Sequence, residues 1–178
     1  MILVTGAGGK TGVAVLKALV ARGAVVQPAA YMQNSLAEWE RMIGDGIYRV
    51  PYPVDTRLSL VDLHDVAKAA ALVLTEAGHS GASYELVGTT PMSQIEIAET
   101  FGRALQRDVR AEAEPIEVWH HRARNAGMGD YPRETLTKMF QAYARDGLKG
   151  NPNVLGWLLK RPPTSLAAFA ARMAATHA

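Results

Sequence analysis

The residues of this chain best suited to do chemistry are the glycines near its start. The first twelve residues read MILVTGAGGKTG, so glycines follow a short apolar run, and an apolar helix is expected from Thr11. The spacing of Gly6, Gly9 and Gly12 lets the backbone turn tightly and brings a phosphate close to main-chain N–H groups. The positive end of the helix dipole favours an anion at the same place. This pattern predicts a site for the pyrophosphate of a dinucleotide.

Two other interpretations of this stretch compete with the dinucleotide site. A P-loop that ended at Lys10 and Thr11 needs a glycine at position 4, where the chain has Val4, so the P-loop is excluded. A glycine turn that serves packing alone stays open, because strand-to-helix turns also use glycine for that purpose. The candidate cofactor-binding residues of the stretch are Gly6, Gly8, Gly9, Lys10, Thr11 and Gly12.

The composition narrows the class of protein. The 178 residues carry 19 Lys and Arg against 17 Asp and Glu, and this small excess gives no basic surface of the kind that nucleic acids need. The absence of cysteine excludes disulfides, thiolate metal sites and thiol catalysis. No apolar run approaches the roughly 20 residues that cross a membrane. We therefore expect a cytoplasmic protein without a nucleic-acid partner, a membrane partner or a metal site.

Strands and helices alternate in the first half of the chain, and helices dominate the second half. The expected strands cover residues 2–5, 24–27, 47–52, 58–61, 83–87 and 109–113. The expected helices cover residues 11–22, 35–43, 63–76, 94–106, 115–126, 133–145 and 165–176. Residues 28–34 are expected to form a loop. This order predicts an α/β fold with a parallel sheet and an attached helical lobe.

Capping signals mark the start of two of these helices. Asp62 is expected to cap the helix over 63–76, and Ser93 with Glu96 forms a capping box for the helix over 94–106. Asp62 and Asp65 are interpreted as capping and helix-dipole residues, not as catalytic groups. The expected inward faces of the two helices are Leu63, Val66, Ala67, Ala70 and Leu74 for the first, and Ile95, Ala98, Phe101 and Leu105 for the second.

Four segments, taken in order, resemble the NmrA-like group of atypical short-chain dehydrogenases/reductases. They are the opening VTGAGGKTG, the segment QPAAYMQN at 27–34, the run LVDLHDVA at 60–67 followed by SYELVG at 83–88, and the closing KRPPTSL at 160–166 with Phe169. Together they extend over nearly the whole chain. The resemblance implies a reduced Rossmann-like fold that binds NAD(P). It implies one domain over 1–178, with the Rossmann-like part at 1–27 and 58–88 and a substrate-side helical lobe at 28–57 and 89–178.

The same resemblance adds candidate residues beyond the glycine turn. In the family, the loop that matches 27–34 lies beside the nicotinamide and the substrate. By this match Pro28, Ala30 and Tyr31 join the candidate cofactor-binding residues, and Tyr31 and Asn34 become candidate substrate-binding residues. Tyr31 is also the one weak candidate for a catalytic group, as a hydrogen-bond donor to a carbonyl. A tyrosine that only packs in the core or at an interface explains the same position equally well.

The chain also departs from the family. It passes between Val26 and Gln27 from the family's second strand directly to the loop after its fifth, so an internal deletion of about 80 to 100 residues is indicated. The positions that recognise the adenosine ribose and hold the adenine fall in the missing part. The chain has no Tyr-x-x-x-Lys pair either, which NmrA-like proteins commonly lack.

Three functions follow as hypotheses. The first is an oxidoreductase-like protein that moves a hydride between the nicotinamide of NAD(P) and a small carbonyl or quinone substrate. The second is a non-catalytic NAD(P) sensor or interaction module of the same family, and the third is a truncated form that has lost dinucleotide binding. The deletion is bridged in one of two ways. Either the strand at 2–5 closes against a hybrid strand at 24–27 and against the strand at 83–87, or two chains exchange elements in a homodimer.

Overall fold

The structure is a computed structural model that describes residues 23–176 and divides the chain into two compact units. The first unit contains residues 23–34, Ser59–Thr90 and Gly150–Ser165, and the second contains Ser35–Leu58, Pro91–Lys149 and residues 166–176. These boundaries differ from the predicted ones chiefly at Gly150–Ser165, which the sequence analysis assigned to the helical lobe. The units are described one at a time below.

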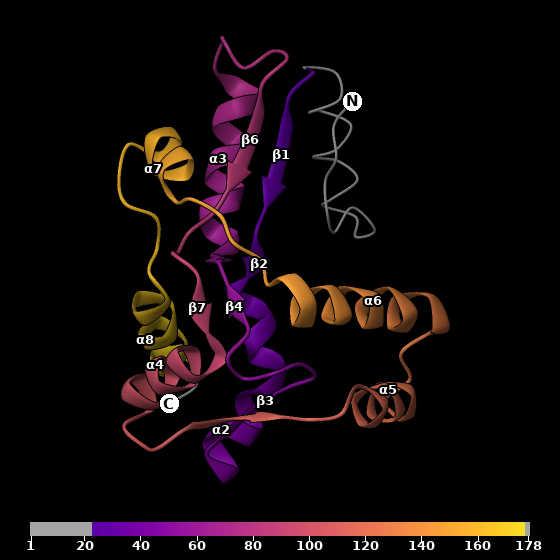
Figure 1. The fold of residues 1–178 in the computed structure, drawn as a ribbon. Coiled ribbons are helices and arrows are strands. Elements are labelled where there is room, and N and C mark those ends of the chain that lie inside the picture. Colours follow the sequence, from indigo (N-terminus) through magenta and orange to yellow (C-terminus); the bar gives the residue numbers. More distant parts are fainter. Residues whose placement is uncertain (1–22, 177–178) are drawn as a thin grey trace. The chain divides into compact units, whose positions relative to one another are not determined.

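The first unit is a small α/β arrangement whose described strands all pair in parallel. Its elements are β1 (Val25–Pro28), β2 (Ala30–Tyr31), β5 (Leu60–Val61), α3 (Leu63–Thr75), β6 (Ser83–Leu86) and α7 (Asn153–Leu159). β1 pairs with β6, and β2 pairs with β5. Figure 1 shows β1 and β6 side by side, with α3 running along them. The predicted α/β class with parallel strands is confirmed in this unit.

The point at which the deletion was inferred lies inside β1. Val26 is paired with Tyr84, and Gln27 with Glu85, so the register continues across it without a break. The hybrid strand and the strand near 83–87 are thus both present, and they pair directly with each other. The expected strand at 2–5, which was predicted to close against both, lies outside the described residues. Side chains from both strands and from α3 and α7 form the core of the unit: Ala24, Val26, Val61, Ala69, Val73, Leu86 and Leu155.

The buried face of α3 agrees with the predicted one in part. Ala70 is buried, and Val66 and Leu74 pack against the core, as predicted. The predictions for Leu63 and Ala67 are wrong, because these residues are exposed and Asp65 and Val73 are buried instead. The helix bounds and the Asp62 cap were predicted correctly, and the Asp62 side chain accepts from His64 N.

The second unit is mostly helical and contains two short pairs of strands. Its elements are η1 (Met32–Glu38, which begins in the first unit), α2 (Trp39–Asp45), β3 (Ile47–Val50), β4 (Arg57–Leu58), β7 (Met92–Ser93), α4 (Gln94–Leu105), β8 (Arg110–Ala113), α5 (Ile116–Asn125), α6 (Asp130–Asp146) and α8 (Leu166–Thr176). β3 pairs in parallel with β8, and β4 pairs antiparallel with β7. The expected helical lobe is thus confirmed as mostly helical.

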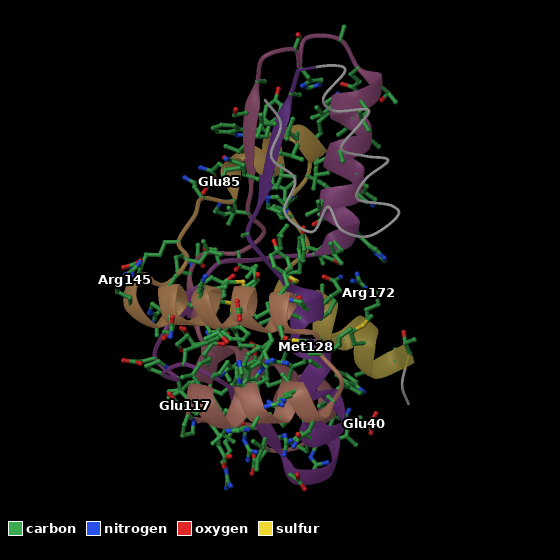
Figure 2. All side chains as sticks on the ribbon, turned by 90° about the vertical axis from the view of Figure 1, so that its right-hand side faces the viewer. Glu40, Glu85, Glu117, Met128, Arg145 and Arg172 are labelled. Atoms are coloured by element: carbon green, nitrogen blue, oxygen red, sulfur yellow. The ribbon has the colours of Figure 1, made fainter. Side chains whose placement is uncertain are left out.

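Phe101 of α4 lies at the centre of the aromatic packing in the second unit. Its ring meets Trp39 and Phe169 edge-on, with centroid distances of 6.3 and 6.4 Å, and Tyr48 at 6.4 Å. Such pairs stabilise a core beyond the area that they bury. Arg172, labelled on α8 in Figure 2, lies over the Phe169 ring at 5.3 Å. The predicted inward position of Phe101 is confirmed, but the prediction for Ile95 is wrong, because Ile95 is 45% exposed.

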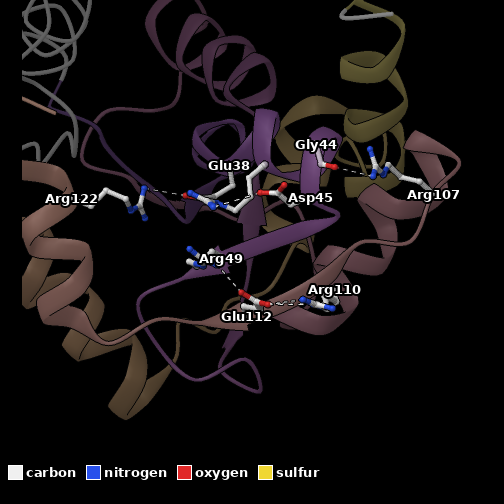
Figure 3. Close-up of polar contacts among 9 residues, drawn as sticks. Glu38, Gly44, Asp45, Arg49, Arg107, Arg110, Glu112 and Arg122 are labelled. Atoms are coloured by element: carbon white, nitrogen blue, oxygen red, sulfur yellow. Dashed lines mark hydrogen bonds and ion pairs between the residues drawn. The ribbon is translucent and has the colours of Figure 1, made fainter. Parts of the chain in front are cut away.

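Charged side chains tie the polar side of the second unit together (Figure 3). Arg49 of β3 donates to Glu112 of β8 at 2.9 Å, which is a cross-strand ion pair in the parallel register. Arg122 of α5 donates to the buried carboxylate of Glu114 and forms an ion pair at 3.4 Å with that of Glu38, to which Arg41 also donates at 2.9 Å. The two cations offset much of the cost of burying the two anions, and Arg122 joins α5 to η1 and to the segment after β8. These contacts give Arg49 and Arg122 a structural role.

In the described residues, no helix is long and apolar enough to cross a membrane.

Candidate functional site

The candidate residues from the 27–34 segment lie at the carboxyl ends of the parallel strands of the first unit. Pro28 ends β1, Ala30 begins β2 and Tyr31 ends it, while Asn34 is exposed in η1. The prediction of a loop over 28–34 is wrong, because Ala29 N donates to Leu86 O and Ala30 pairs with Leu60, which keeps the chain extended. In open parallel sheets this is the edge at which ligands bind.

Tyr31 is anchored as well as placed at this edge. It is half-buried, it is paired with Val61 in the parallel register, and it packs against the core of the first unit. The glycine turn at Gly6, Gly8, Gly9, Lys10, Thr11 and Gly12 lies outside the described residues. The assignment of cofactor and substrate contacts therefore stays a prediction.

The segment after β6 packs unusually close to β5. Gly88 N donates to Leu60 O at 2.8 Å, and Thr89 N donates to the same oxygen at 2.9 Å. A Cβ at position 88 would lie 2.8 Å from Leu60 O, closer than real Cβ atoms come, and 3.1 Å from Val61 Cα, which is tighter than most real contacts. Thr89 Oγ1 completes the contact by accepting from Leu60 N at 3.0 Å. Glycine at position 88 therefore allows the segment after β6 to approach the main chain of β5 this closely.

A polar contact joins the segment after β2 to the start of α3. Gln33 Nε2 donates to Asp62 Oδ1 at 2.7 Å, and Gln33 Oε1 accepts from Leu63 N at 3.2 Å. Asp62 Oδ1 also accepts from His64 N at 3.1 Å. Asp62 is fully buried. The first N–H groups of α3, which have no partner within a helix, are thus satisfied partly by its own cap and partly by Gln33.

A second polar contact ties the segment before α8 to the first turn of α3. The Asp65 carboxylate is 1% exposed, and it accepts from the Arg161 guanidinium and from Thr164 N, the latter at 2.6 Å. Burial alone raises the pKa of a carboxyl, but the hydrogen bonds from Arg161 and Thr164 outweigh burial here and hold the pKa of Asp65 below its usual value. Asp65 is therefore an ionised anchor, more than a helix-dipole residue.

Gln33 and Arg161 have no predicted role in this region, and Asp65 was predicted to act only as a helix-dipole residue. All three residues lie in segments that carry the resemblance to the NmrA-like group, but the resemblance does not show which groups their side chains contact. Burial of Asp65 would have indicated that it has partners, but the periodicity of the sequence does not show that this residue is buried.

The histidines at 79 and 120 make local contacts with neighbouring side chains. In the described part of the chain, no group of three His, Asp or Glu side chains is placed to hold a metal ion. His79 Nδ1 and the Tyr84 hydroxyl are 2.7 Å apart in the first unit. In the second unit, His120 Nε2 accepts from Arg133 Nε at 3.1 Å, and Arg133 also donates to the carbonyl of Met128, labelled in Figure 2. Both histidines are accounted for by these local contacts.

Parallel strands, a helix crossing between β5 and β6, and candidate residues at the strands' carboxyl ends define a Rossmann-like protein. The chain is 27% identical over 150 residues to an NAD(P)H azoreductase of Xenophilus azovorans, a match that covers 84% of this chain and 52% of that protein. No family model matches the chain.

Solved structures show the same fold. The chain is similar to an Escherichia coli NADPH-dependent quinone oxidoreductase complexed with NADPH, with a TM-score of 0.73 and 23% identity over 89% of this chain and 56% of that one. It is also similar to NmrA, a negative transcriptional regulator in complex with NAD, with a TM-score of 0.60 and 15% identity over 86% and 53%.

These comparisons confirm the resemblance to the NmrA-like group of atypical NAD(P)-binding reductases and the Rossmann-like fold. The chain spans about half the length of the relatives that it matches.

Proposed function

We propose that this chain is an NAD(P)-binding oxidoreductase that transfers a hydride between the nicotinamide and a small carbonyl or quinone substrate. The observation that supports it most is the match over 84% of the chain to an NAD(P)H azoreductase, together with the fold that it shares with an NADPH-dependent quinone oxidoreductase. The preference between NADH and NADPH is left to experiment.

The described residues at the strand ends suit a dinucleotide. Residues 23–34 contain no charged side chain, and Pro28, Ala29 and Ala30 are small, apolar and half-buried. Such a surface suits the flat nicotinamide ring, which is fixed by a few polar groups at its rim. In this proposal the opening glycines bind the pyrophosphate, and Tyr31 and Asn34 bind the substrate. When bound, the cofactor supplies the hydride.

The chain's own contribution is orientation. Tyr31, held by its pairing with Val61, offers a phenolic O–H as a hydrogen-bond donor to the oxygen of a carbonyl or quinone. A donor there polarises the substrate and stabilises the negative charge that grows on this oxygen during hydride transfer. The one proton that completes the reduction, added to the oxygen after the hydride, comes from solvent. We further propose a cytoplasmic location and, for the missing part of the sheet, exchange of elements in a homodimer.

The test measures binding and turnover separately. Titration of the 178-residue chain with NADPH and NADH, followed by tryptophan fluorescence, measures binding, and loss of nicotinamide absorbance with a panel of quinones and azo compounds measures turnover. Turnover supports an oxidoreductase. Binding without turnover for any acceptor in the panel supports the sensor hypothesis instead, and no binding at millimolar concentration contradicts both.

Sizing in solution tests the homodimer. A dimer supports element exchange, and a monomer at micromolar concentration contradicts it.

A further inference from the structure

Gln33 is the side chain that links the candidate substrate segment to the rest of the first unit. Its two amide atoms bind two groups of another element: Nε2 donates to the Asp62 carboxylate, and Oε1 accepts from Leu63 N. We propose that Gln33 is a positioning residue, which holds Tyr31 and Asn34 at the carboxyl edge of the strands in the geometry that substrate binding needs. This inference rests on the proposed function.

The position of Gln33 explains why such a link is needed. Backbone pairing between β2 and β5 ends with Tyr31 opposite Val61. Gln33 lies two residues after the end of β2, and Asp62 directly follows β5. The hydrogen bond between their side chains therefore extends the contact between the two strands beyond the last paired residues. Asn34, which is exposed, follows Gln33 directly in η1, so its position depends on how Gln33 is held.

The chemistry of the link requires an amide. Asp62 is fully buried, so its oxygens need donors, and Gln33 Nε2 is one of them, with His64 N. Leu63 N needs an acceptor, and Gln33 Oε1 is one. Glutamate has nearly the same shape, but it places a second carboxylate oxygen 2.7 Å from Asp62 Oδ1, where the two charges repel. Gln33→Glu therefore breaks one half of the link with little change in volume.

The experiment compares Gln33→Glu with two other chains. Gln141→Glu makes the same change at an exposed glutamine of α6 that has no side-chain hydrogen bond within the described residues, and it serves as the matched control. The double variant Gln33→Glu with Asp62→Asn leaves one carboxylate in the contact, so the repulsion between two charges is removed, while the asparagine Oδ1 still accepts from His64 N as a cap. Each chain is used at a temperature at which circular dichroism shows it to be folded.

Two measurements are made on each variant. The first is steady-state reduction of a quinone by NADPH, from which KM and kcat are separated. Gln33→Glu is expected to raise the KM for the quinone about tenfold, because misplacing a substrate contact by about 1 Å costs that much or more. The dissociation constant for NADPH is expected to stay within about twofold, because the opening glycines, which are proposed to bind the pyrophosphate, are unchanged. The double variant is expected to recover part of the KM, and Gln141→Glu to match the wild type.

The second measurement is hydrogen exchange of the segment 29–34, followed by mass spectrometry, which needs no activity. Faster exchange in Gln33→Glu alone, reversed in the double variant, supports the inference. Unchanged exchange, or an unchanged KM in an active folded variant, overturns it, since a residue that only stabilises α3 alters neither in the folded chain. If the wild type neither binds NADPH nor reduces any quinone, the proposed function is contradicted. The hydrogen-exchange result still decides whether Gln33 holds residues 29–34 in place.

Discussion

Arg161 donates to the carboxylate of Asp65 from 96 positions further along the chain, and both residues lie within the first unit. The contact fastens the segment between α7 and α8 to the first turn of α3. Asp65 is almost wholly buried, whereas the Arg161 side chain is 38% exposed. The anion therefore depends on its partners far more than the cation does, and the two residues are expected to respond unequally to substitution.

Arg161→Ala is expected to lower the free energy of unfolding by about 1–3 kcal/mol. The variant leaves a buried carboxylate with Thr164 N but without its cation, and partial exposure of Arg161 keeps the loss below that of a fully buried pair. Urea unfolding at pH 7 measures it. Arg145→Ala, which breaks an exposed pair with Asp146, is the control and is expected to change stability by less than about 0.5 kcal/mol. Equal effects of the two substitutions would contradict the account.

Asp65 also makes stability depend on pH. Its pKa in the folded chain lies below the usual value of about 3.9, so the ionised form stabilises the fold above that value. This contribution is lost as the pH falls below about 4 toward the folded pKa. The stability difference between the wild type and Asp65→Asn is therefore expected to be constant from pH 7 to 5 and to shrink below pH 4. Denaturant unfolding at four pH values measures it, and a difference that stays level down to pH 3 argues against the role of the ionised form.

The capping box of α4 gives a local test. Ser93 Oγ accepts from Glu96 N at 3.2 Å, and Glu96 Oε2 accepts from Ser93 N at 2.7 Å. Ser93→Ala is expected to cost about 1 kcal/mol in the free energy of unfolding. Ser80→Ala, at an exposed serine of the turn before β6, is the matched control and is expected to be neutral. A neutral Ser93→Ala would mean that the cap adds nothing to the stability of α4.

Gly88 tests the close approach of the segment after β6 to β5. Gly88→Ala is expected to cost about 1–3 kcal/mol, because its Cβ meets the main chain at Leu60 and Val61, which cannot move aside as a flexible side chain does. Gly44→Ala in α2, where nothing lies within 4 Å of the added carbon, is expected to be neutral or to stabilise by up to about 1 kcal/mol. Thermal unfolding compares the two, and the reverse order of stabilities would contradict the packing described here.

The parts of the fold that depend on neighbours in sequence could be predicted from the residues. The start of α3 at Asp62 and the capping box at Ser93 are examples, because each signal and its partner lie within four residues. The strands at 24–27 and 83–87 were also predicted to within a residue or two. Their direct pairing with each other was not predicted, because the strand at 2–5 was expected to close against both.

The parts that depend on distant partners could not be predicted. Asp65 was taken for a helix-dipole residue because Arg161 lies 96 positions away and nothing near Asp65 in the sequence indicates burial. The loop expected over 28–34 is partly strand, because Leu60 and Leu86 supply pairing that overrides the effect of Pro28. The contacts made by Gln33 were missed for the same reason, since Asp62 lies 29 positions away.

The measurement that tests the central claim most directly is the dissociation constant for NADPH of the wild-type chain and of Gly9→Ala. The account predicts saturable binding by the wild type and binding at least about tenfold weaker in Gly9→Ala, because a methyl group keeps the pyrophosphate from the main-chain N–H groups. Gly44→Ala is the control and is expected to bind as the wild type does. No saturable binding by the wild type, or equal affinity in Gly9→Ala, would contradict the claim that the opening glycines form a dinucleotide site.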